Sequence, residues 1–243
     1  MNPLLAAVAD VLFPASCGSC RAMLPHQALL CDRCQDSATE VTAPMCDRCG
    51  LPSIQSTCVD CAELDDASQS FDRARALYVY RGPVEKALLR AKFGDAPAVC
   101  EAAGEEMGQA LLSGRVEGLD RNPDGVCWVP VGRRRLARRG YDQSALIAER
   151  VARVLQRPLL RHKVKRHRET SAQAQQDRHA RARNVCDAFS FCTSTSVADH
   201  NILLIDDLVT TGHTAQAAAA ALKRAGAKRV EVLSLARASF GGV

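Results

Sequence analysis

The sequence has few aromatic residues and no long hydrophobic run. Phe, Trp and Tyr make up 4% of the 243 residues, and no stretch reaches the roughly 18 apolar residues of a membrane-spanning helix. The N-terminus lacks the basic start and the small-residue cleavage site of a secretory signal. The phosphate-binding pattern G-x-x-x-x-G-K-[ST] is also absent, which argues against a P-loop nucleotide hydrolase. These absences predict a cytoplasmic globular protein without a membrane span.

Cysteine, in contrast, is abundant. Eight of the 12 cysteines form four C-x-x-C pairs, which are Cys17 and Cys20, Cys31 and Cys34, Cys46 and Cys49, and Cys58 and Cys61. One such pair can aim two thiolates at one metal ion, and two pairs complete the tetrahedral coordination of structural zinc. The pairs therefore predict a double zinc-ribbon module over residues 15–66 with up to two Zn²⁺ ions. A redox dithiol would open a helix in a βαβ unit, and no such pattern surrounds these pairs.

The spacing leaves open how the pairs combine. Adjacent ribbons would join the first pair with the second and the third with the fourth, whereas interleaved ribbons would join the first with the third. The module has few aliphatic residues, so zinc has to supply much of its folding free energy, about 10 to 16 kcal/mol per structural site. The other four cysteines, Cys100, Cys127, Cys186 and Cys192, lack this spacing, and we expect them to be buried packing residues.

The remaining sequence alternates between strand and helix patterns. Residues 3–13 predict an amphipathic helix within an N-terminal segment, 1–14. Strands are expected at 74–80, 126–131, 158–164, 189–191, 201–205 and 229–235, and helices at 84–94, 98–112, 143–155 and 215–225. A long polar loop is expected from Lys165 to Asn184. This alternation predicts an α/β domain over residues 71–243, with one mostly parallel sheet flanked by helices on both faces.

Charge is distributed unevenly along the chain. Residues 1–70 carry three basic and nine acidic side chains, whereas residues 126–200 carry sixteen basic and six acidic ones. A concentrated positive field suits an anionic ligand, from a pyrophosphate to a nucleic-acid backbone. Five arginines fall in an expected loop after the 126–131 strand, at positions 133, 134, 135, 138 and 139. Few aromatic residues interleave the basic ones, so we expect base stacking to contribute little to nucleic-acid binding.

The most informative segment runs from Ile202 to Thr214. Four aliphatic residues predict a buried parallel strand, and ligands of such sheets bind beyond the carboxyl ends of the strands, where Asp206 and Asp207 stand. A threonine- and glycine-rich turn then opens an alanine-rich helix, whose first N–H groups favour an anion. A simple turn with a helix N-cap is the alternative. Together the residues predict a pocket for a phosphorylated ribose.

This segment resembles the phosphoribosyl pyrophosphate (PRPP) loop of type I phosphoribosyltransferases, in which two acids and two further residues precede Thr-Thr-Gly and a threonine. Over nearly the whole chain, the sequence resembles the ComF family of competence-associated proteins. The resemblance rests on the four C-x-x-C pairs, Pro130-Val131, the blocks Arg139 to Gln143 and Arg181 to Val185, and the PRPP loop. It implies a type I phosphoribosyltransferase-like fold preceded by a double zinc ribbon. Family members usually have asparagine at Asp142 and a leucine near Gln176.

The resemblance also implies a binding site. The 5-phosphate of PRPP would bind the loop formed by Val209, Thr210, Thr211, Gly212, His213 and Thr214. Asp206 and Asp207 would be the catalytic residues, binding the ribose hydroxyls and stabilising positive charge on the ribose. Mg²⁺ would bridge ribose and pyrophosphate oxygens. Val131, Gly132 and Arg133 would hold the pyrophosphate, with Arg139, Lys165 and Arg166 nearby.

Two functions are compatible with this site. The first is PRPP binding in natural competence and DNA uptake, with single-stranded DNA and other competence proteins as partners. The second is a base- or amine-specific phosphoribosyltransferase of nucleotide salvage, which needs an acceptor pocket. Residues 73–120 show no base-binding constellation. Tyr80 or Phe93 could stack on a base, but aromatic residues at strand and helix positions are more often in the core.

Overall fold

The centre of the structure, a computed structural model, is a four-stranded sheet in which all neighbours run parallel. The structure describes residues 15–63, 70–94, 96–161, 164–166, 189–191 and 196–238. The sheet order is β1 (Arg73–Val79), β6 (Arg229–Arg237), β5 (Asn201–Val209) and β2 (Gly125–Trp128). The expected helix at residues 3–13 lies outside the described residues. The strands are rich in aliphatic residues because helices cover both faces of the sheet.

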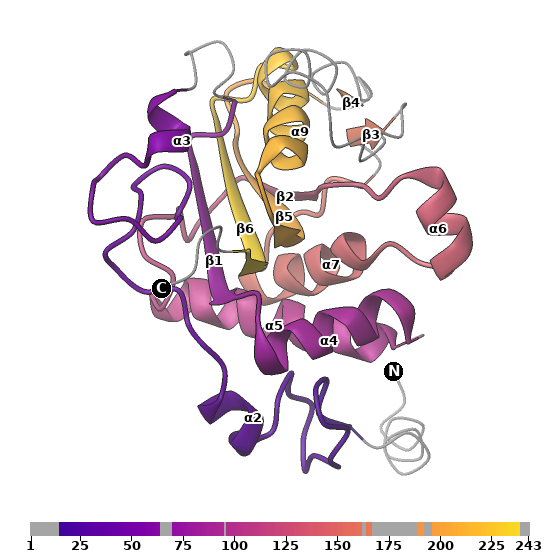
Figure 1. Cartoon of the computed structure of the whole chain (residues 1–243). Coiled ribbons are helices and arrows are strands. Elements are labelled where there is room, and N and C mark those ends of the chain that lie inside the picture. Colours follow the sequence, from indigo (N-terminus) through magenta and orange to yellow (C-terminus); the bar gives the residue numbers. More distant parts are fainter. Residues whose placement is uncertain are drawn as a thin grey trace.

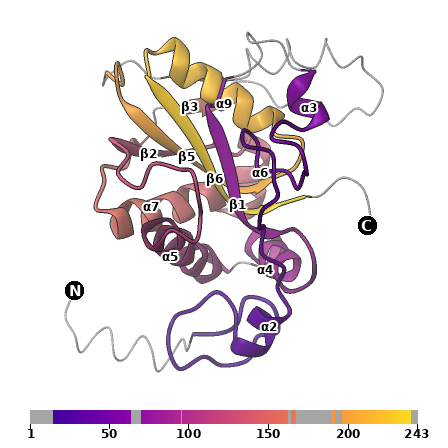
Figure 2. The same ribbon diagram turned by 90° about the vertical axis from the view of Figure 1, so that its left-hand side faces the viewer.

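The helices form two layers (Figures 1 and 2). On one face lie α4 (Gly82–Phe93), α5 (Pro97–Ser113) and α7 (Gln143–Leu155), which pack with alternate residues of the strands in one apolar cluster. On the other face lies α9 (His213–Arg224), whose buried alanines allow a close approach to the sheet. The predicted α/β fold with helices on both faces is therefore confirmed. None of the helices in the described ranges is long and apolar enough to cross a membrane.

The first cysteine ribbon packs against α4 and α5. Leu29 and Leu30 lie in the same apolar cluster as residues of both helices, and Arg90 of α4 donates from Nη1 to the carbonyl oxygen of Cys17 over 2.9 Å. The short helix α2 (Asp32–Asp36) follows the third cysteine of this ribbon. The ribbon thus extends the core beneath the sheet (Figure 2).

The second ribbon covers the outer edge of β1. The amide of Ala74 donates to the carbonyl oxygen of Arg48 over 2.6 Å, and Glu40, in the segment that links the two ribbons, pairs with Tyr78 in an antiparallel bridge. The short helix α3 (Val59–Ala62) belongs to the same ribbon. An uncovered edge strand is open to pairing with other chains. The ribbon removes that edge.

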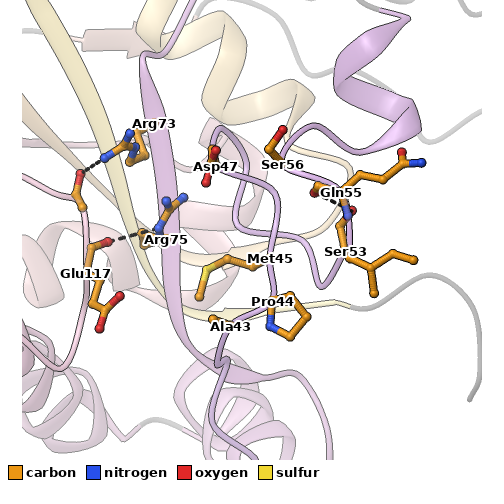
Figure 3. A pocket seen from close by; sticks show the side chains of 12 residues that line it. Ala43, Pro44, Met45, Asp47, Ser53, Gln55, Ser56, Arg73, Arg75 and Glu117 are labelled. Carbon is orange, nitrogen blue, oxygen red and sulfur yellow. Dashed lines mark hydrogen bonds between the residues drawn. The ribbon is translucent and has the colours of Figure 1, made fainter.

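A groove of about 450 Å³ lies between this ribbon and the sheet (Figure 3). Arg73 and Arg75 of β1 line it together with Asp47 and Glu117, so its charges balance. Arg75 is buried and donates to three backbone carbonyls: from Nε to Glu117 over 3.1 Å, and from Nη1 to Ala74 over 2.8 Å and to Cys46 over 3.5 Å. The arginine therefore ties the second ribbon to the sheet.

Three expected elements differ in the structure. The strand expected at 158–164 is not a continuous strand over the residues described: Leu159 makes a single parallel bridge to β2, residues 162–163 lie outside the described residues, and Val164 begins a separate strand. β2 ends at Trp128, before Pro130, rather than at 131. The predicted basic loop was also wrong: Arg133–Arg139 form the helix α6. Arginine is a good helix former, and exposure to solvent screens the repulsion among these side chains.

Two short strands form a separate antiparallel sheet. These are β3 (Val164–Arg166) and β4 (Phe189–Phe191). The strand expected at 189–191 is thus present, and the expected polar loop starts with two strand residues, its remainder lying outside the described residues. Cys100 and Cys127 are buried, as expected.

Gly50 offers a test of how closely the second ribbon approaches β1. Its φ is +67°, and a Cβ would lie 2.7 Å from the carbonyl oxygen of Ala74. Gly82 is a matched control, because its φ is +57° and a Cβ would meet nothing within 4 Å. Both alanine variants carry the left-handed backbone penalty of about 1 kcal/mol, and only Gly50→Ala adds an overpacking cost of about 2 kcal/mol.

We therefore expect the melting temperature of Gly50→Ala to lie about 4 to 8 °C below that of Gly82→Ala in thermal unfolding. Equal melting temperatures would contradict the close docking of the ribbon on β1.

Candidate functional site

Asp206 and Asp207 lie within strand β5, near its carboxyl end, rather than after it. The strand continues to Val209, four residues past its predicted end. Asp206 is 8% exposed, and its Oδ1 accepts from the hydroxyl of Ser144 over 3.3 Å and from the amide of Asp207 over 2.9 Å. Burial, reinforced by the charge of Asp207, raises the pKa of Asp206 well above its usual value. A nearby cation would offset this shift.

Asp207 has such a cation beside it. Lys92 Nζ lies 3.0 Å from Asp207 Oδ2, and the two side chains are 16% and 14% exposed. Lys92 stands in the last turn of α4, where the helix dipole also favours a positive charge. The acidic pair thus combines a buried carboxyl and an ion-paired carboxylate.

The loop after the acids leads directly into α9. Val209 is buried and ends β5, and Thr210 and Thr211 are exposed. Gly212 has a φ of +79° at the N-cap of α9, a conformation that favours glycine. Among the described residues, the backbone N–H groups of Thr210, Thr211 and Gly212 have no hydrogen-bond acceptor. Such amides at a helix N-terminus suit a phosphate.

Side chains orient the first turn of α9. His213 is its first residue, and its Nδ1 lies 2.7 Å from the Thr211 hydroxyl. Thr214 follows within the same turn. Gln216 accepts from the amides of Ser70 and Phe71 at the start of the sheet domain. This contact connects the loop helix to the chain that enters β1.

Asp142 organises the segment after β2. Its Oδ2 accepts from the amide of Val131 over 3.1 Å and from Trp128 Nε1 over 3.3 Å, while Oδ1 caps α7 at Ala145. Burial raises the pKa of Asp142. The amide of Val131, a predicted pyrophosphate contact, is thus already engaged. Gly132 is the N-cap of α6.

Helix α6 exposes four of its five arginines to solvent, whereas the last, Arg139, is half-buried. Arg133 is exposed at its start. Arg139, at its end, donates from Nη1 to Gln143 over 2.7 Å. Burial lowers the pKa of Arg139, and the charge of Asp207 opposes that shift. Lys165 and Arg166 belong to β3, where the structure describes the backbone alone.

Phe93 brings an aromatic ring into the arginine cluster. The ring is 63% exposed, and the guanidinium carbons of Arg138 and Arg139 lie 5.6 and 5.4 Å from its centre. These are cation–π distances. Few aromatic residues interleave the basic ones in the sequence, as noted, but the fold brings Phe93 next to Arg138 and Arg139.

Sequence analysis named Phe93 as a ring that could stack on a base, but it missed Lys92 and Ser144. Lys92 was expected only near the end of one helix, and Ser144 only near the start of another. Each contacts a residue that is distant in the chain, so the local patterns used to find elements carry no signal for them. A basic and aromatic pair at the end of a helix was the one available hint.

The cysteines form two groups of four, from adjacent pairs. Cys17, Cys20, Cys31 and Cys34 make the first group, and Cys46, Cys49, Cys58 and Cys61 the second, with the sulfur atoms of each group within 4.8 Å of one another. The Sγ atoms of Cys20 and Cys31 lie 3.7 Å apart, and those of Cys49 and Cys58 lie 3.6 Å apart. Zn–S bonds of about 2.3 Å place tetrahedral sulfurs about 3.8 Å apart. The groups therefore fit two structural zinc ions, and the interleaved alternative is excluded.

The acidic pair also fits a magnesium ion. Mg²⁺ is usually held by one or two carboxylates together with phosphate oxygens of a ligand. Asp206 and Asp207 supply such carboxyl groups, and a bound cation would offset the burial that raises the pKa of Asp206. Protein groups alone would leave such a metal sphere incomplete, so a phosphate ligand would have to complete it.

The fold and the two cysteine groups define a phosphoribosyltransferase-like protein with an N-terminal double zinc ribbon. Residues 8–63 match the double zinc ribbon domain, and residues 141–239 match the phosphoribosyl transferase domain. The chain is 30% identical to the DNA utilization protein YhgH of Escherichia coli K12, over 92% of this chain and 97% of that protein. The chain belongs to the ComF/YhgH family.

Two other relatives carry competence names. Competence protein F of Haemophilus influenzae is 28% identical, over 93% of this chain and 98% of that protein. Competence protein ComFC of Bacillus subtilis is 27% identical, over 84% and 82% of the two chains. Among solved structures, the glutamine PRPP amidotransferase of B. subtilis aligns with a TM-score of 0.37 and 21% identity. That alignment covers 55% of this chain and 26% of the amidotransferase.

Zinc content tests the two cysteine groups. We expect the purified protein to contain two zinc ions per chain by elemental analysis, because each group offers four thiols at zinc-compatible spacing. Cys49→Ser and Cys20→Ser should each lower the content to about one ion, whereas Cys100→Ser, at a buried cysteine outside both groups, should leave two. A wild-type content near one would contradict the assignment of two zinc sites.

Proposed function

We propose that the protein binds PRPP together with Mg²⁺ at the carboxyl end of β5 and acts in the uptake or use of DNA. One observation carries the ligand: a buried acidic pair leads, within the same strand and loop, to amides of Thr210 to Gly212 that have no acceptor among the described residues. In a ribose with a terminal phosphate, the hydroxyls would bind the acidic pair and the phosphate dianion would bind the free amides.

In this proposal each group of the site has a role. The 5-phosphate binds the loop from Val209 to Thr214, and the ribose hydroxyls bind Asp206 and Asp207. Magnesium, when bound, neutralises pyrophosphate oxygens. Gly132, Arg133 and Arg139 would hold the pyrophosphate, with Lys165 and Arg166 of β3 as further cations for it. The amide of Val131 can contribute only if Asp142 releases it.

The role in DNA handling rests on the relatives and on charge. The relatives are named for DNA utilization and competence. The exposed arginines of α6 form a positive surface beside the acidic pair, and phosphates of single-stranded DNA would bind there. Phe93, within this cluster, supplies a ring on which a base can stack. Other competence proteins are the proposed protein partners.

A second candidate is transfer of the phosphoribosyl group to a nucleobase or amine. The observation that favours it is the exposure of Phe93 next to Lys92, which contacts Asp207. An acceptor base could stack there while the bond between the ribose and pyrophosphate breaks. Asp206 and Asp207 would then stabilise positive charge on the ribose, and the basic residues would stabilise the leaving pyrophosphate.

PRPP binding is tested by calorimetric titration in the presence of Mg²⁺. We expect Asp206→Asn with Asp207→Asn to weaken binding at least about tenfold, or about 1.4 kcal/mol, because the ribose and the metal lose their carboxylates. Asp36→Asn, at an exposed acid of α2, is the control and should bind as the wild type does. Unchanged affinity in the double variant would place PRPP elsewhere.

The same samples separate the two candidates. Pyrophosphate release with one acceptor in a screen of nucleobases and amines identifies a transferase. PRPP binding without release supports a binding protein.

DNA binding by α6 is tested through its salt dependence. Replacing Arg133, Arg134 and Arg135 by alanine removes up to three phosphate contacts, so the slope of log K against log salt for single-stranded DNA should fall by about 2. The control replaces Arg121, Arg153 and Lys228 by alanine. These exposed residues lie toward the amino ends of the parallel strands, away from the carboxyl ends where the site lies. An equal loss of slope in both variants would mean that the α6 surface has no special role.

A further inference from the structure

The contact between Lys92 and Asp207 joins two elements far apart in the chain. Nζ and Oδ2 are 3.0 Å apart, and both side chains are mostly buried. Lys92 is thus held at the acidic pair, where it neutralises the charge of Asp207. An ion pair shielded from water in this way is screened much less by salt than a surface pair.

Asp206 depends on the same cation. Among the described residues, Asp206 accepts hydrogen bonds from the hydroxyl of Ser144 and from the backbone amide of Asp207, and both donors are neutral. The charge of Lys92 acts on Asp206 as well, since it lowers the pKa that burial raises. Arg139 also lies in the field of Asp207 but donates to Gln143. Among the side chains that the structure describes, Lys92 is therefore the cation that contacts the pair.

A magnesium ion would act on the same carboxylates. Two positive charges a few ångströms apart repel each other strongly, even at the raised effective dielectric constant of a protein surface. A divalent ion binding the free protein would have to displace Lys92 or bear this repulsion. An ammonium group has three N–H donors, so Lys92 can keep Asp207 and also donate to a ligand oxygen.

We propose that Lys92 is a built-in counter-cation of the acidic pair, which keeps divalent ions off the free protein and reduces how much Mg²⁺ a phosphorylated ribose needs for binding. The second half of this inference rests on the proposed function. The first half concerns the free protein alone and can be tested without PRPP.

The first test measures Mn²⁺ binding to the ligand-free zinc protein by electron paramagnetic resonance. Lys92→Gln should bind Mn²⁺ at least about tenfold more tightly than the wild type, and Lys92→Arg, which keeps the charge, should resemble the wild type. Lys86→Gln, on the exposed face of the same helix, is the control and should change nothing. Adding Asp207→Asn to Lys92→Gln should remove the gain. Equal Mn²⁺ affinity in Lys92→Gln and the wild type overturns the proposal.

The second test titrates PRPP in buffer with and without Mg²⁺, and without a chelator, because chelators would remove the structural zinc. We expect Mg²⁺ to raise the PRPP affinity of the wild type only a few-fold. In Lys92→Gln the same ratio of affinities, with and without Mg²⁺, should be at least about tenfold larger. An identical Mg²⁺ dependence overturns the proposal. If no variant binds PRPP, the proposed function fails, while a gain in Mn²⁺ affinity still establishes Lys92 as the counter-cation of the pair.

Discussion

The site depends on the difference in length between two neighbouring strands. β2 pairs with β5 from Gly125 opposite Ile202 to Trp128 opposite Ile205, and there β2 ends, while β5 continues to Val209. On the other side β6 remains paired with β5 past Asp206. The acids therefore stand at a notch in the sheet. Helix α7 supplies Ser144 to Asp206 at this notch, and α4 supplies Lys92 to Asp207.

The cysteine module supports the site indirectly, through its contacts with α4 and with β1. Its first ribbon shares an apolar cluster with α4, the helix that carries Lys92 and Phe93. Its second ribbon covers the edge of β1 with backbone hydrogen bonds. Because a short cysteine-rich segment has little core of its own, metal binding holds the surface on which these contacts depend. The zinc centres are thus structural supports, distant in sequence from the acids.

The sequence patterns predicted those parts of the structure that are determined by residues close together in the chain. The aliphatic run before Asp206, the glycine at the start of α9 and the C-x-x-C pairs each specify their own backbone, so the strand, the loop and the individual cysteine pairs were predictable. The combination of cysteine pairs, the reach of Lys92 to Asp207 and the position of Phe93 among arginines depend on packing between distant segments. The helical state of Arg133–Arg139 was missed because glycines at both ends and a run of charge suggested a loop. The boundaries 15–66 and 71–243 and the roles of the individual site residues stay predictions.

The most direct measurement is a crystal structure of the protein with PRPP and Mg²⁺. We predict that the 5-phosphate lies within hydrogen-bond distance of the amides between Thr210 and Thr214, with the ribose hydroxyls on Asp206 and Asp207. PRPP bound at another place, with the acidic pair and its loop unchanged, would contradict the account.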